Sequence, residues 1–91
     1  MTAKDFVEEK LRFLISIFKG VHIKYKYMPV QRSHLVEVIP AEFMQGNEDY
    51  FKEEAQIIEE FDQLFPDESI DFISNDSDIT IDKADLELYS R

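Results

Sequence analysis

Two histidines and a run of acidic residues are the side chains of this sequence whose types and spacing could support chemistry. His22 and His34 fall in neighbouring segments, and either would need a nucleophile and an orienting carboxylate beside it for catalysis. The pattern of the two segments places the imidazoles on opposite faces of a predicted sheet, so they cannot share a metal ion or a proton. The sequence has no cysteine and two glycines, which excludes thiolate sites and a glycine-rich phosphate loop. We therefore predict a protein that is not an enzyme and has no cofactor.

The acidic residues near the C-terminus offer an alternative chemistry, the binding of a divalent cation. Oxygen-bearing side chains occupy the first, third, fifth, seventh and twelfth positions of a calcium-loop pattern: Asp76, Asp78, Thr80, Asp82 and Glu87. The glycine that such a loop needs is replaced by Ile81, and no helices flank the segment. In the predicted strand pairing Asp71 also faces Asp82, a like-charge pair that a cation would relieve. A cation-binding domain that uses the acidic cluster of residues 71–87 is kept as an alternative, with solvated surface acids as the default.

The charge of the chain bears on the kind of partner. Twenty acidic and ten basic residues give a formal charge of -10, which repels nucleic-acid phosphates and anionic membranes. Residues 1–34 carry a net charge of +4 and residues 35–91 a net charge of -14. The longest apolar run, 11–18, is interrupted and is much shorter than the ~20 residues of a membrane span. We expect a cytoplasmic protein whose partner is another protein or a second copy of itself, with no nucleic acid and no membrane.

Two amphipathic helices are predicted to position these side chains. The first runs from Ala3 to Lys19, with Thr2 as its N-cap and Gly20 after its end. The second runs from about Glu48 to Phe65, and Pro66 stops it. Its predicted apolar stripe consists of Phe51, Ala55, Ile58, Phe61 and Phe65, with Tyr50, Ile57 and Leu64 beside it.

Four strands are predicted between and after the helices. Alternation indicates a hairpin of 21–28 and 33–39, with Met28 opposite Ser33. This register collects Ile23 and Tyr25 on an inner apolar face, and it places Lys24 opposite Glu37 on the outer face. A third strand over 69–74 and a fourth that starts at Ile79 are predicted to form a second hairpin, in which Phe72 faces Ile81 and a bulge or turn follows near residues 83–85.

These elements define one α+β domain over residues 1–91. The expected architecture is a two-layer sandwich, with two helices on one face of a four-stranded antiparallel sheet and the order α-β-β-α-β-β. A meander and a permuted ferredoxin-like strand order fit the sequence equally well.

The function that this pattern favours is that of a small acidic protein-interaction module. It would bind a protein partner, or itself, through the exposed sheet face and the basic first hairpin, with these candidate residues: Lys24, Lys26, Leu35, Glu37 and Ile39. The main alternative is an acidic nucleic-acid mimic, or inhibitor of a basic protein, with Glu53, Glu59, Glu60 and Asp62 on the second helix as part of the mimic.

Overall fold

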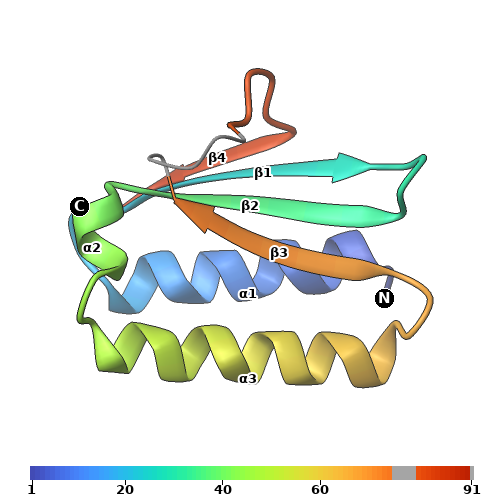
Figure 1. Cartoon of the computed structure of the whole chain (residues 1–91), viewed down its shortest axis with the longest axis horizontal. Helices are drawn as coiled ribbons and strands as arrows, with labels where there is room; N and C mark the ends of the chain where they lie inside the picture. Colours follow the sequence, from blue (N-terminus) through green and yellow to red (C-terminus); the bar gives the residue numbers. More distant parts are fainter. Residues whose placement is uncertain (75–79, 91) are drawn as a thin grey trace.

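The computed structural model describes residues 1–74 and 80–90, and these residues form three helices and four strands (Figure 1). In chain order the elements are α1 (Ala3–Ile17), β1 (His22–Met28), β2 (Ser33–Ile39), α2 (Ala41–Met44), α3 (Glu48–Leu64), β3 (Ser69–Ser74) and β4 (Leu86–Tyr89). The strands form one sheet, and α1 and α3 both lie on the same side of it (Figure 1). The predicted α+β class is confirmed, whereas the predicted element order lacks the short helix α2.

α1 begins where the sequence predicts because Thr2 and Asp5 cap it reciprocally. The Thr2 hydroxyl accepts a hydrogen bond from the Asp5 backbone N–H at 3.1 Å, and the Asp5 carboxylate accepts one from the Thr2 backbone N–H at 3.1 Å. The hydrogen bond from the Thr2 backbone is the main reason why the pKa of Asp5 lies below its usual value. The helix ends at Ile17 rather than Lys19, since Phe18 is already extended. Gly20, at φ 75°, then turns the chain toward β1.

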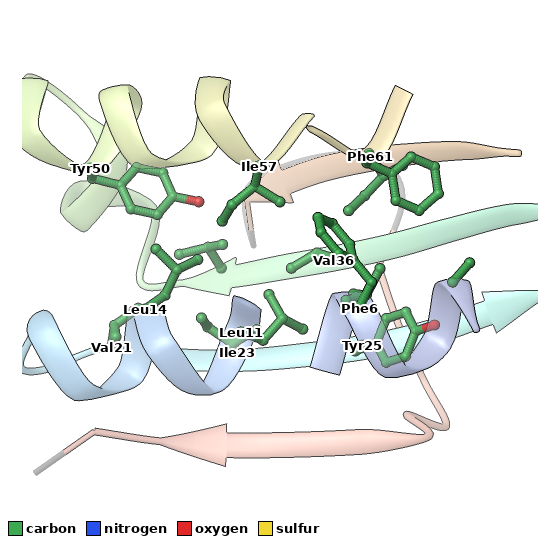
Figure 2. Close-up of a cluster of buried hydrophobic side chains, with 14 residues drawn as sticks. Phe6, Leu11, Leu14, Val21, Ile23, Tyr25, Val36, Tyr50, Ile57 and Phe61 are labelled. Carbon is green, nitrogen blue, oxygen red and sulfur yellow. The ribbon is translucent and has the colours of Figure 1, made fainter. Parts of the chain in front are cut away.

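The first hairpin has the predicted register. β1 and β2 are antiparallel, and Met28 lies opposite Ser33, Tyr25 opposite Val36 and Lys24 opposite Glu37. Ile23 and Tyr25 point into the core between the sheet and the helices (Figure 2), and both are fully or almost fully buried. The predicted inner face of this hairpin is therefore confirmed.

The predicted second hairpin is wrong, because β3 and β4 lie at opposite edges of the sheet. The strand order is β3-β2-β1-β4, with β3 parallel to β2 and β4 antiparallel to β1, so the sheet is mixed rather than antiparallel. The cause is α3, since a helix between two neighbouring strands returns the chain to the starting end of the first strand. As a result Phe72 pairs with Val36 rather than Ile81, and Asp71 pairs with Leu35 rather than Asp82. This order is neither a meander nor the permuted ferredoxin-like order.

Residues 80–85 lie on the side of the sheet that faces away from the helices, and they lead the chain into β4 (Figure 1). The predicted strand start at Ile79 and the predicted turn at 75–78 lie outside the described residues. Ile81 is not in a strand but is buried against the outer face, and β4 begins only at Leu86. Leu86 and Leu88, in contrast to Ile81, point to the inner face of the sheet and pack on the core there. The change of apolar phase between Ile81 and Leu86 therefore marks a turn that moves the chain from one face of the sheet to the other.

α3 is rotated about its axis relative to the prediction. Its buried residues are Tyr50, Ile57 and Phe61, whereas Phe51 and Ala55 of the predicted stripe are exposed. Helical spacing puts a carboxylate on this core-facing stripe as well, because Glu54 is one turn from both Tyr50 and Ile57. Partial burial there raises the pKa of Glu54 to about 7, because desolvation disfavours the charged form.

Candidate functional site

The five candidate residues of the outer sheet face are brought together by the backbone, but their side chains differ in access. Lys24, Lys26, Leu35, Glu37 and Ile39 all lie on the face opposite the helices. Leu35 is 8% exposed and Glu37 is 3% exposed, in contrast to the open sheet face that the sequence predicts. The three accessible members of the set are Lys24, Lys26 and Ile39.

Ile81 is the residue that covers this part of the outer face. Its side chain is 3% exposed, and its backbone N–H donates a hydrogen bond of 3.1 Å to the Glu37 carboxylate. Lys24 lies opposite Glu37 in the register, but it forms no ion pair within the described part of the chain. We call residues 80–85 the crossing segment. The buried Glu37 carboxylate thus binds a backbone amide of this segment rather than the Lys24 ammonium group that the sequence suggested.

A groove of about 350 Å³ is left between β1, β2 and the crossing segment. Its apolar lining comes from Met28, Leu35 and Ile81, and its rim carries Lys26, Asp82 and Lys83, with Thr80 completing the wall. The Lys26 ammonium donates a hydrogen bond of 3.1 Å to the Lys83 carbonyl oxygen, which fixes one cation at the rim. The arrangement can receive an apolar side chain next to a negatively charged group. We call it the outer groove.

The two histidines lie on opposite faces of the sheet, as the sequence predicts. On the outer face His22 stacks on Tyr89 of β4, with 4.0 Å between ring centroids, and its Nε2 atom lies 3.3 Å from a Glu87 carboxylate oxygen. His34 is fully buried on the inner face.

His34 is the centre of a hydrogen-bonded network that the sequence did not reveal. Its Nδ1 atom lies 2.6 Å from the Tyr25 hydroxyl, and its Nε2 atom lies 2.8 Å from a Glu68 carboxylate oxygen. A neutral imidazole with its proton on Nε2 satisfies both contacts, since it donates to Glu68 and accepts from Tyr25. Burial raises the pKa of Tyr25 above its usual value, so the hydroxyl stays protonated.

This hydroxyl–imidazole–carboxylate arrangement matches the composition of a catalytic triad but not its accessibility. Tyr25 and His34 are completely buried, and Tyr27 and Phe61 pack against the imidazole at centroid distances of 4.6 and 5.3 Å. A substrate therefore cannot contact the hydroxyl in this conformation. The network instead joins β1, β2 and the chain that enters β3, which is a stabilising role.

The Tyr25→Phe variant is expected to lower the free energy of unfolding by about 1–2 kcal/mol, because it leaves the buried Nδ1 atom of His34 without a donor. Urea unfolding followed by far-UV circular dichroism measures the change. Tyr27→Phe is the matched control, since the Tyr27 hydroxyl makes no hydrogen bond to the described residues. Equal losses in both variants would contradict the assigned role of the network.

The residues proposed for cation binding are not brought together where the structure describes them. Asp71 and Asp82 do not face each other, and residues 1–74 and 80–90 contain no cluster of three or more histidine, aspartate or glutamate side chains suited to a metal ion. Asp76 and Asp78 lie outside the described residues.

The fold and the outer groove define a small α+β protein with a mixed four-stranded sheet, helices on its inner face and a chain segment across its outer face. No protein family model, curated protein or solved structure matches the chain. Within the described residues, none of the helices has the length and apolar character needed to cross a membrane.

Proposed function

We propose that this protein is a non-catalytic protein-interaction module, and that the outer groove binds a partner segment with an apolar side chain flanked by acidic residues. The observation that carries the proposal is the composition of the groove, in which an apolar floor of Met28, Leu35 and Ile81 lies beneath a rim where two lysines, Lys26 and Lys83, outnumber one carboxylate, Asp82. Lys24 and Ile39, on the same face, extend the surface along the sheet.

Charge supports this choice of partner. Residues 1–34 are net positive within a chain of formal charge -10, so the basic hairpin is the region where an acidic segment meets least repulsion. The same total charge favours a protein partner over nucleic acid.

The buried position of Tyr25 and His34 supports a non-catalytic role, and the cysteine-free composition accords with a location in the cytoplasm.

A synthetic acidic peptide with one central phenylalanine tests the proposal. We expect it to bind the protein at low salt, and we expect Lys26→Glu/Lys83→Glu to weaken binding about tenfold or more by reversing two rim charges. The matched control is Lys4→Glu/Lys52→Glu, which reverses two exposed lysines on the helices. Fluorescence anisotropy of the labelled peptide measures both.

Three results would count against the outer groove. The first is that the peptide does not bind the wild-type protein. The second is that both double variants weaken binding equally. The third is that a peptide with serine in place of phenylalanine binds as tightly as the original peptide. Sedimentation across a range of protein concentrations identifies the competing occupant, a second copy of the chain, by a rise in mass.

A further inference from the structure

A second groove lies between α1 and α3, on the opposite side of the molecule from the outer groove. The two helices run antiparallel and side by side beneath the sheet (Figure 1). The groove has a volume of about 280 Å³ and is lined by Lys10, Phe13, Glu53, Gln56, Ile57 and Glu60. We call it the helix groove.

The two walls of the helix groove differ in chemistry. α1 contributes Phe13, which is 44% exposed, and Ile17 follows one turn later at 46% exposed. α3 contributes Glu53, Gln56 and Glu60, which are one turn apart along one side of the helix. The almost fully buried Ile57 is the floor between them. A wall of Phe13 and Lys10 therefore faces a wall with two carboxylates across an apolar floor.

The protein neutralises the acidic wall only in part, because one of its two carboxylates, Glu53, is left without an ion pair among the described residues. Among the lining residues Lys10 is the cation, and it is already engaged by Glu60 at 3.2 Å and by the Phe6 ring at 5.5 Å. Glu53 forms no ion pair with any described residue. α3 as a whole carries seven acidic residues and one lysine, so the field around this wall is strongly negative.

We propose that the helix groove binds a basic amphipathic helix of a partner protein. The apolar stripe of that helix would contact Phe13, Ile17 and Ile57, and its flanking lysine or arginine residues would pair with Glu53. A helix suits the site because two adjacent helices form a groove into which the side chains of a third helix pack. A second copy of this chain is disfavoured as the occupant, since it would bring two acidic α3 helices together. This surface is separate from the outer groove and does not depend on the function proposed there.

The probe is a model peptide of about 18 residues, or five helical turns, with leucine at helical spacing and lysine elsewhere. We expect Phe13→Ser/Glu53→Lys to weaken its binding about tenfold or more. The matched control is Phe51→Ser/Glu59→Lys, because Phe51 is also 44% exposed and Glu59 is exposed on the same helix. The control is expected to bind within about twofold of the wild-type protein, which separates groove binding from general attraction to an acidic surface.

Nuclear magnetic resonance of the wild-type protein gives a readout that does not depend on variants. Peptide-induced shifts are expected at residues 13, 17, 53 and 56. The variant Lys26→Glu/Lys83→Glu, at the outer groove, should not weaken the binding of this peptide. The proposal is overturned if the peptide does not bind, if both double variants lose affinity equally, or if the shifts map to β1 and residues 80–83. Failure of the acidic-peptide experiment at the outer groove would leave this result unaffected.

Discussion

Replacing Ile81 with alanine is expected to lower the free energy of unfolding by about 2–4 kcal/mol, although residue 81 lies outside every helix and strand. The side chain is buried over the outer sheet face, and its removal leaves a cavity beside Leu35. It also loosens the backbone N–H that donates to the buried Glu37 carboxylate. Urea unfolding measures the loss, and faster hydrogen exchange of the residue 81 amide would locate its origin.

Ile17→Ala is the matched control for this variant, since it makes the same substitution at an isoleucine that is 46% exposed. We expect a change within about 0.5 kcal/mol there, as is usual for surface positions. A comparable loss at both positions, or no loss at Ile81, would show that the crossing segment does not seal the outer face.

Glu54→Gln is expected to stabilise the protein by about 1–3 kcal/mol at about pH 8 and to have little effect at about pH 4. Because the pKa of Glu54 is raised to about 7 in the folded state, the folded protein binds a proton that the unfolded chain has released. The stability that this bound proton contributes is fully present below the ordinary pKa of 4.5 and is lost as the pH rises through 7. Glutamine has no charge to desolvate, so the benefit of the variant appears at the higher pH. The lower part of the range allows for the partial exposure of the side chain.

The control is Glu59→Gln, at an exposed position of the same helix. Its stability relative to the wild-type protein should not change with pH, and urea unfolding at both pH values measures this difference directly. If Glu54→Gln were destabilising at the higher pH, the assignment of Glu54 to a desolvated position would be wrong.

The first hairpin could be predicted from the sequence because two independent features agree on one register. Pairing Met28 with Ser33 unites Ile23 and Tyr25 with Val36 on one face, and it sets Lys24 opposite Glu37 on the other. A shift by one residue would lose both features. Local alternation and a short turn are sufficient information for such a pair of strands.

The rotation of α3 could not be predicted in the same way. Its apolar residues cover a wide arc of the helix, so a stripe centred on Phe51 and Ala55 is as apolar as the observed stripe of Tyr50, Ile57 and Phe61. The choice depends on packing against α1 and the sheet, which local periodicity does not contain.

The candidate site was predicted only in its backbone positions. Leu35 and Glu37 lie on the outer face as expected, but their burial follows from the placement of β3 and β4 at opposite edges, which sends the chain across that face. Glu68 was missed for a similar reason. It lies outside any periodic segment, and its proximity to His34 follows from the parallel pairing of His34 with Ile70. If the connection from β2 through α3 to β3 had been recognised as a parallel crossover, the burial of the outer face and the position of Glu68 could both have been predicted.

The position of β4 beside β1 has a consequence for the association of this protein with other chains. β4 pairs with residues 22–25 of β1, so detachment of residues 86–89 would expose unpaired amide and carbonyl groups along that side of β1. Such a strand border is a template for association with other chains. Detachment of β4 would therefore create an aggregation-prone state, and pairing of this four-residue strand covers the edge of β1.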